Sequence, residues 1–287
     1  MKSSGYHSAL AHAVRAARAA GALIRRNLGA DKVVNVTSRY DIKLELDERS
    51  QALIEKMLRR DFPRVAVLGE EGISGDKAAD ARWVLDPIDG TVNFAYGIPH
   101  ACVSIALQVK KASPSAFAGL RRDKKSKVQS RKSGNSEYQT VIGVVYDPFC
   151  DELWTAVRGQ PARLNGKAIH VSRRRRLADC IVTMGFSKSQ GSLHRTLPFF
   201  EKLVPRVRKV RLTGAAALDL TYVASGRFDA FIERGVRLWD IAAGGLILEC
   251  AGGEFWHEQI EGFETYRIIA NNSFVRKKIQ SLKRDFP

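Results

Sequence analysis

Residues 83–94 read WVLDPIDGTVNF, and both the fold and the candidate site can be worked out from this stretch. Its first three residues are apolar and typical of a buried strand, and the polar residues that follow predict a turn into a helix. Asp86 and Asp89 lie three residues apart at this turn, and Pro87 between them stiffens the backbone. We therefore expect both carboxylates to point to the same side of the sheet.

A second apolar run, residues 64–68, also ends at polar residues, so Glu70 is expected to reach the same pole of the fold. Gly90 and Thr91 lie at the expected N-terminus of the helix that follows the first strand. Unpaired backbone N–H groups and the helix dipole favour an anion there, and a phosphate would fit.

A fourth acid, Asp240, follows Trp239 at the start of a helix predicted in the second half of the chain. Magnesium usually takes one or two carboxylates, keeps several waters and binds substrate phosphate, so these four acids indicate a magnesium site. Alternatively, they are ordinary turn, loop and helix-capping residues, as Asp47 could also be. Four acids at strand ends and helix starts would repel one another unless cations neutralise them, but spacing alone leaves both readings open.

Apolar periodicity predicts helices and strands that do not alternate regularly, which favours a layered α+β fold over a doubly wound sheet. Helices are expected over residues 10–28, 47–62, 193–203, 215–225, 241–251 and 273–283. Strands are expected over residues 64–68, 83–85, 102–109, 141–146, 152–157, 181–184, 229–233 and 267–270, with a hairpin turn at 164–167. We divide the chain into an N-terminal α+β half, 1–142, with most of the acids, and a C-terminal α/β half, 143–287, with Asp240.

Composition predicts a globular protein that does not cross a membrane. Its 287 residues are 45% hydrophobic and 27% charged, and no apolar run approaches the roughly 20 residues of a membrane span. Residues 1–21 lack the order of basic, apolar and small residues that marks a signal peptide. Cys102, Cys150, Cys180 and Cys250 form no Cys-x-x-Cys pair and are expected to be reduced and packed. A cytoplasmic protein is therefore predicted.

The formal net charge of +17 predicts an acidic partner, which is a small phosphate ester or else RNA or DNA. Residues 110–140 are read as a mobile basic loop inserted between two strands, because so few apolar side chains cannot offset the entropy of ordering it. The basic run within this loop spans residues 121–132, and two more basic runs lie at 173–176 and 206–211. None of the runs contains interleaved aromatic residues for base stacking, so solvated surface and polyanion contact both stay open.

Three motifs, in this order, resemble the inositol monophosphatase family: Gly69-Glu70-Glu71, residues 83–94 and residues 239–244. Residues 214–220, with Glu233 behind them, are similar to the bacterial extragenic-suppressor branch of that family. The resemblance runs nearly from end to end, apart from the basic insertion. It implies an α-β-α-β-α sandwich of the sugar phosphatase type, usually a homodimer, and a magnesium-dependent phosphatase that lithium inhibits.

The resemblance also implies roles for single residues. The implied ligands of two or three Mg²⁺ ions are Glu70, Asp86, Asp89, Asp240 and the carbonyl oxygen of Ile88. The implied catalytic residues are Asp47, Thr91 and Glu70. The implied substrate contacts are Asp89, Gly90, Thr91, Gly214, Ala216 and Glu233. Thr91, hydrogen-bonded to Asp47, would orient a metal-activated water, so that no covalent intermediate is needed.

Hydrolysis of inositol monophosphate is the leading reading, and two others stay open. One is a phosphatase for histidinol phosphate, fructose 1,6-bisphosphate or a nucleotide 3′-phosphate. The other is an RNA-associated regulatory protein of the same fold, for which the basic insertion is the motive. Leu44, Ala215 and Arg163 depart from the usual residues of the family, which bears on substrate preference more than on reaction class.

Overall fold

The computed structural model describes residues 3–37, 42–76, 78–111, 137–186 and 190–282. Its α-helices are α1 (Ser3–Asn27), α2 (Glu45–Asp61), α3 (Thr91–Ala95), α4 (Gln190–Leu203), α5 (Ala216–Ala224), α6 (Leu238–Cys250) and α7 (Arg276–Gln280). Two short 3₁₀ helices are η1 (Leu177–Asp179) and η2 (Val204–Arg206). None of the helices in these described ranges is long and apolar enough to span a membrane.

The strands form two large sheets and one small ribbon. The eight-stranded sheet, in the order β10-β9-β8-β7-β6-β5-β3-β4, contains β3 (Ala66–Gly69), β4 (Gly72–Ser74), β5 (Ala81–Asp89), β6 (Cys102–Lys110), β7 (Tyr138–Asp147), β8 (Glu152–Val157), β9 (Arg163–Leu164) and β10 (Lys167–Ala168). The five-stranded sheet, in the order β12-β11-β13-β15-β14, contains β11 (Ile181–Met184), β12 (Lys209–Arg211), β13 (Ala230–Arg237), β14 (Glu254–Gln259) and β15 (Thr265–Asn271). The ribbon pairs β1 (Val34–Thr37) with β2 (Ile42–Leu44).

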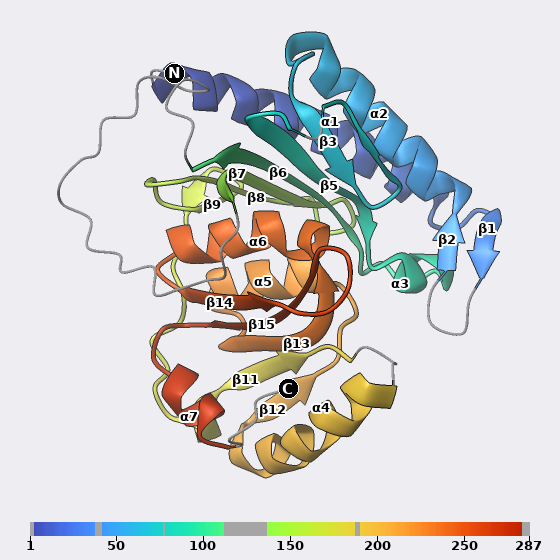
Figure 1. The fold of residues 1–287 in the computed structure, drawn as a ribbon. Helices are drawn as coiled ribbons and strands as arrows, with labels where there is room; N and C mark the ends of the chain where they lie inside the picture. The colour runs from blue at the N-terminus through green and yellow to red at the C-terminus, as the bar shows by residue number, and fades with distance from the viewer. Residues whose placement is uncertain (1–2, 38–41, 77, 112–136, 187–189, 283–287) are drawn as a thin grey trace.

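Helices and sheets alternate in five layers (Figure 1). α1 and α2 cover one face of the eight-stranded sheet, and α5 and α6 lie between that sheet and the five-stranded one. α4 and α7 pack on the outer face of the second sheet through apolar residues such as Phe199 and Ile279. The predicted α-β-α-β-α sandwich is therefore confirmed.

Small side chains let α1 lie close to the first sheet. Its buried stripe consists largely of alanines, including Ala13, Ala16 and Ala20, and it packs against β6 and β7. A helix that presents alanines brings its backbone nearer to a sheet than one that presents leucines, so this contact is dense. The predicted core-facing opening helix is confirmed.

Most predicted elements are present, and four of the five missed strands have only three or four residues. The predicted strands at 152–157 and 181–184 have the bounds of β8 and β11, and the hairpin at 164–167 is confirmed by positive φ angles at Asn165 and Gly166. β1, β2, β4, β12 and β14 were not predicted. The last helix begins later than predicted, because the Asn271 and Asn272 side chains accept hydrogen bonds from the next turn's N–H groups and hold that turn outside a helix.

Three further predictions concern the domain boundary, the basic insertion and the cysteines. The predicted boundary between residues 142 and 143 falls inside β7, a central strand of the eight-stranded sheet, and the two halves stay a prediction. Lys110 and Tyr138 pair at the ends of β6 and β7, and residues 112–136, most of the predicted insertion, lie outside the described residues. Cys150 is exposed in the turn after β7, so the prediction that every cysteine is packed is wrong there.

Candidate active site

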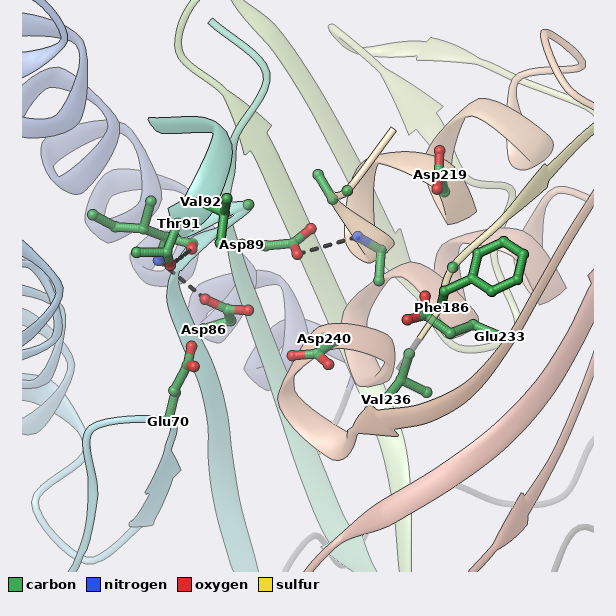
Figure 2. A pocket seen from close by; sticks show the side chains of 16 residues that line it. Glu70, Asp86, Asp89, Thr91, Val92, Phe186, Asp219, Glu233, Val236 and Asp240 are labelled. Carbon is green, nitrogen blue, oxygen red and sulfur yellow. Dashed lines mark hydrogen bonds between the residues drawn. The ribbon is translucent and has the colours of Figure 1, made fainter. Parts of the chain in front are cut away.

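A pocket of about 270 Å³ lies where the carboxyl ends of β3 and β5 approach α5, α6 and β13 (Figure 2). Its lining residues are Glu70, Asp86, Ile88, Asp89, Gly90, Thr91, Val92, Gly185, Phe186, Gly214, Ala215, Ala216, Asp219, Glu233, Val236 and Asp240. Six of these described residues are acids, and none is lysine, arginine or histidine. The pocket therefore concentrates negative charge in a protein whose overall charge is strongly positive.

Parallel pairing brings Glu70 beside Asp86. β3 and β5 run parallel with Gly69 opposite Leu85, and the Glu70 N–H donates to the Leu85 carbonyl at 3.1 Å. Because parallel strands end at the same edge of a sheet, the residues after each strand become neighbours. The predicted approach of Glu70 to the aspartates is confirmed.

A bulge in β5 turns Asp86 and Asp89 to the same side. In a regular strand, residues three apart point to opposite faces. The pairing of β5 with β6 shifts between these two aspartates, and the Ile88 N–H donates to Asp86 Oδ1 at 3.0 Å across the shift. The extra residue re-aims the strand, so both carboxylates line the pocket.

Asp89 joins the first sheet to α5. Its Oδ1 and Oδ2 accept hydrogen bonds from the N–H groups of Ala216 at 3.1 Å and Ala217 at 2.7 Å. These are the first residues of α5, whose N–H groups have no partner within the helix. The alternative reading of Asp89 as a capping residue is thus correct for a helix 127 positions away in sequence. The predicted substrate contact Ala216 has its N–H engaged in this bond.

Asp47 and Asp240 occupy equivalent places in two helices. Each is the third residue of its helix, and each carboxylate accepts from the N–H before the first turn, that of Leu44 or Arg237, at 2.7 Å in both cases. The alternative reading of both as N-cap residues is wrong, because the N-cap residues are Leu44 and Arg237. Both aspartates nevertheless accept the backbone N–H of that N-cap residue. α6 also packs against β5, so that Asp240 lies near Asp86 and its charge helps to raise the pKa of Asp86.

Thr91 lies between two acceptors. Its hydroxyl is 2.8 Å from the Ile88 carbonyl oxygen and 3.4 Å from Asp47 Oδ1. A hydroxyl carries one proton, so it donates to one of them at a time, and the shorter contact is with Ile88. The predicted Thr91–Asp47 pair is therefore within reach, whereas Asp47 itself lies behind Thr91 and outside the pocket lining.

Glycines shape two walls of the pocket. Gly90 has φ +90°, and a Cβ there would lie 2.9 Å from the His100 carbonyl oxygen, so no other residue fits without strain. A Cβ on Gly185 would lie 1.9 Å from the Glu233 carboxyl group. The absence of a side chain at Gly185 is what gives the Glu233 carboxylate its place.

Asp219, Gly185 and Phe186 also line the pocket and were not predicted as site residues from the sequence. Asp219 Oδ2 accepts from the hydroxyls of Thr183 at 2.9 Å and Thr213 at 2.6 Å, while its buried Oδ1 has no partner among the described residues. The motif at 214–220 contains Asp219 and was the available signal.

Burial and mutual repulsion raise the pKa values of most of the acids that line the pocket. Burial, followed by the charges of Glu70, Asp89 and Asp240, raises the pKa of Asp86 well above its usual range. Burial also raises the pKa values of Asp89, Asp219 and Asp240 to about 7 each. Burial and nearby aspartates raise the pKa of Glu233 in the same direction. The site therefore lacks compensating positive charge, a deficit that a cation would fill.

The donor set fits a hard divalent cation such as Mg²⁺, since every candidate ligand is an oxygen. Across the described ranges, no three His, Cys, Asp or Glu side chains come together closely enough to hold one ion. Magnesium needs only one or two carboxylates when water and substrate oxygens complete its shell, so pairs such as Glu70 with Asp86 suffice. Glu70, Asp86, Asp89, Asp240 and the Ile88 carbonyl are the residues that would hold it.

Comparison with known proteins gives relatives along nearly the whole chain. The chain is 39% identical over 272 residues to the Nus factor SuhB of Pseudomonas aeruginosa, covering 91% of this chain and 90% of that protein. It is 36% identical over 289 residues to the Nus factor SuhB of Escherichia coli, covering 97% of both.

Solved structures show the same fold. The extragenic suppressor protein suhB from Bartonella henselae superposes with a TM-score of 0.80 at 32% identity, covering 96% of this chain and 98% of that one. An inositol monophosphatase from Anabaena gives 0.77 at 30% identity, covering 99% and 98%. A sequence model described as the inositol monophosphatase family matches residues 6–116 and 136–283. With the motifs, the fold and the relatives all in agreement, this chain belongs to the inositol monophosphatase family.

Proposed function

We propose that this protein hydrolyses small phosphate monoesters with Mg²⁺ as its cofactor. The observation that carries the proposal is the group of Glu70, Asp86, Asp89 and Asp240, brought from three elements to one pocket with no basic side chain among its described lining residues. Asp86 and Asp89 are buried, and Glu70 and Asp240 are partly exposed. An acidic pocket repels a phosphate dianion unless cations lie between them. Magnesium-dependent release of phosphate from a panel of small esters is the test.

Each group in the pocket has a proposed task. Bound Mg²⁺, at two or three positions, would lower the pKa of a water and neutralise charge on the phosphate. Thr91 would donate to Asp47 and accept from the attacking water, so that the water is aimed at phosphorus. The backbone N–H groups of Gly90 and Thr91 are the proposed phosphate donors. Glu70 would hold both the metal and the water.

The proposed substrate is inositol monophosphate, with the rest of the substrate placed against Gly214, Ala216 and Glu233. The pocket of about 270 Å³ suits a small ester. Asn93 supports this wall, because its side-chain amide donates to the Thr213 carbonyl at 2.9 Å and to the His100 carbonyl at 2.9 Å. Histidinol phosphate, fructose 1,6-bisphosphate and a nucleotide 3′-phosphate are the alternatives that the panel separates.

Magnesium should stabilise the folded protein more at high pH than at low pH. Asp89 and Asp240 have pKa values of about 7 in place of their ordinary 3.8, so without divalent cations the folded state binds more protons than the unfolded state between these values. The protons that the folded state binds in excess raise its free energy of unfolding. This contribution is fully present below about pH 4 and is lost as pH rises through about 7. Mg²⁺ should replace those protons, so the Mg²⁺-induced rise in Tm should be larger at pH 8 than at pH 5.

Differential scanning fluorimetry with Mg²⁺ or with EDTA measures this difference directly. Asp31→Asn, on an exposed residue, is the matched control and should keep the full pH-dependent response. An Mg²⁺ effect that is the same at both pH values would show that the cation binds elsewhere than on these carboxylates.

Three further properties are proposed from membership of the family. We propose a homodimer, inhibition by Li⁺ and a cytoplasmic location. All four cysteines are free thiols, which agrees with a reducing compartment. Adding LiCl to the phosphate-release assay tests the second property.

A second proposed function is association with RNA. The relatives named Nus factor support it, because that name indicates work with RNA polymerase or RNA. The net charge of +17 supports it too, and so does the basic segment, since residues 117–135 fall between the two parts that match the family. The two functions are compatible, because hydrolysis needs the acidic pocket whereas RNA needs a basic surface.

A further inference from the structure

A basic surface lies at the opposite end of the second sheet from the pocket. β11 runs parallel to both β12 and β13, and the pocket residues Gly185 and Gly214 follow the carboxyl ends of β11 and β12. At the amino-terminal ends of these strands lie exposed cations from three segments, which we call the strand-start surface. Its members are Arg173, Arg175, Arg176, Arg208, Lys277 and Lys278.

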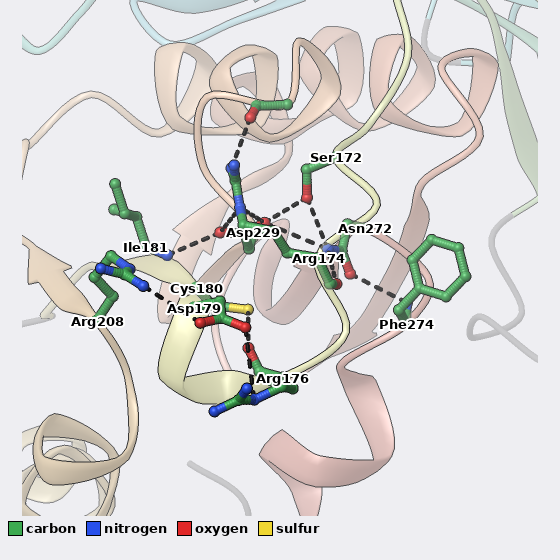
Figure 3. Close-up of polar contacts among 11 residues, drawn as sticks. Ser172, Arg174, Arg176, Asp179, Cys180, Ile181, Arg208, Asp229, Asn272 and Phe274 are labelled. Carbon is green, nitrogen blue, oxygen red and sulfur yellow. Dashed lines mark hydrogen bonds and ion pairs between the residues drawn. The ribbon is translucent and has the colours of Figure 1, made fainter.

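A polar network around the buried Asp229 joins the loop before η1 to the starts of β11 and β13 and to the turn before α7 (Figure 3). Asp229 is fully buried, and its carboxylate accepts from Arg174 Nε at 2.8 and 2.9 Å and from the Ile181 N–H at 2.8 Å. Asn272 Nδ2 donates to the Ser172 hydroxyl and to the Arg174 carbonyl, both at 2.9 Å. The backbone that carries Arg173 and Arg175 is therefore held in one arrangement before any partner binds.

Contacts at the surface draw the segments together further. Lys278 Nζ donates to the Arg175 carbonyl at 2.6 Å, which joins α7 to the loop before η1. Arg176 and Arg208 both pair with Asp179, at 3.6 and 3.3 Å. The Asp179 carboxylate is thus the ion-pair partner of two guanidinium groups. In the described part of the chain, Arg173, Arg175 and Lys277 form no ion pair with an acid. The clustered cations repel one another, so a polyanion would stabilise this surface.

An exposed aromatic ring lies within the cluster. Phe274 is 41% exposed, and the Arg175 guanidinium lies over its ring, 4.8 Å from the centroid. Its N–H donates to Asn272 Oδ1 at 3.1 Å, so the buried network positions this residue as well. The basic run at 173–176 contains no aromatic residue, but Phe274, about a hundred residues away in sequence, supplies one beside it. A flat ring beside arginines suits an unstacked base, and the cations suit the phosphates next to it.

We propose that the strand-start surface, with Phe274, binds single-stranded RNA. Arginine predominates in it, and the planar guanidinium pairs well with phosphate. The inference rests on the proposed association with RNA and gives it a location that is separate from the pocket. It needs neither the metal site nor residues 112–136.

The test measures binding of a labelled single-stranded oligouridine over a series of salt concentrations. Arg173→Gln, Arg175→Gln and Lys277→Gln are combined in one variant, since all three are exposed and form no ion pair with an acid among the described residues. Each lost phosphate contact lowers the slope of log affinity against log salt by about 0.7, so the slope should fall by about 2 and the affinity by roughly tenfold or more. Arg15→Gln, Arg26→Gln and Lys56→Gln, exposed on α1 and α2, are the matched control and should bind nearly as the wild type does.

Phe274→Leu tests the stacking contact. It should weaken binding of the single strand several-fold and leave binding of a duplex of the same length unchanged. An equal effect on both forms would remove the role of the ring, and tighter binding of polyglutamate than of oligouridine at the same salt would replace RNA with an acidic protein.

Different results would contradict the proposed binding surface and the proposed association with RNA. If the wild type binds RNA and the strand-start variant matches the control variant, the proposed location is wrong. If the wild type shows no salt-dependent binding at all, the association with RNA itself fails. Thermal unfolding and phosphate release of each variant confirm that the fold and pocket are intact.

Discussion

Asp240→Asn is expected to lower kcat/KM for the best phosphate ester by roughly a thousandfold, or about 4 kcal/mol of transition-state stabilisation. The substitution removes one negative charge from the proposed cation site and keeps the size of the side chain. An asparagine oxygen can still accept from the Arg237 N–H, which Asp240 does at 2.7 Å, so the start of α6 should persist. Phosphate release under saturating Mg²⁺ measures the loss, and circular dichroism checks the fold.

Asp89→Asn is a less clean version of the same experiment. Both Asp89 oxygens accept N–H groups of α5, and asparagine would turn an amide donor toward one of them. We expect loss of activity together with a lower Tm, whereas Asp240→Asn should lose activity with little change in Tm without divalent cations. Full activity in Asp240→Asn would exclude Asp240 as a metal ligand.

Thr91→Ala is expected to lower kcat about a hundredfold while KM changes little, because the proposed task of the hydroxyl is to aim water rather than to hold substrate. In the structure this hydroxyl lies 3.4 Å from Asp47 and 2.8 Å from the Ile88 carbonyl. Catalysis would require the proton to turn toward Asp47, which frees the Ile88 oxygen for a cation. Steady-state kinetics on both variants of this pair, Thr91→Ala and Asp47→Asn, should show similar losses that do not add.

Thr91→Ser is the matched control for that experiment. It keeps the hydroxyl and removes only a methyl group, so kcat should stay within a few-fold of the wild type. A rise in KM equal to the loss in kcat would make Thr91 a binding residue, and an unaffected Thr91→Ala enzyme would remove its role in orienting water.

The sequence was sufficient to place the acids because local patterns define strand ends. The apolar runs 64–68 and 83–85 predict two strands, and parallel pairing of β3 with β5 then brings the polar residues after these runs together. The bulge between Asp86 and Asp89 was not predicted, although both carboxylates were expected on the same side. Whether the carboxylates serve the roles that the family implies is a separate question, which the experiments above address.

Contacts between distant segments were beyond the reach of local patterns. Nothing near Asp89 in sequence predicts that it caps α5, and nothing near Gly185 predicts that Glu233 needs its space. Strands of three residues such as β12 have too few side chains to produce an alternating pattern. The pairing of Arg175 with Phe274 is of the same kind, since it depends on the buried network around Asp229.

The most direct test of the proposed function is phosphate release by the purified wild-type protein from inositol monophosphate, with Mg²⁺ and with EDTA. The site described above predicts rapid release with Mg²⁺, none above background with EDTA, and recovery when Mg²⁺ is restored. Histidinol phosphate, fructose 1,6-bisphosphate and a nucleotide 3′-phosphate, assayed in parallel, identify the preferred ester. Release that persists in EDTA, or no release from any ester with Mg²⁺ present in a folded protein, would contradict a magnesium-dependent phosphatase.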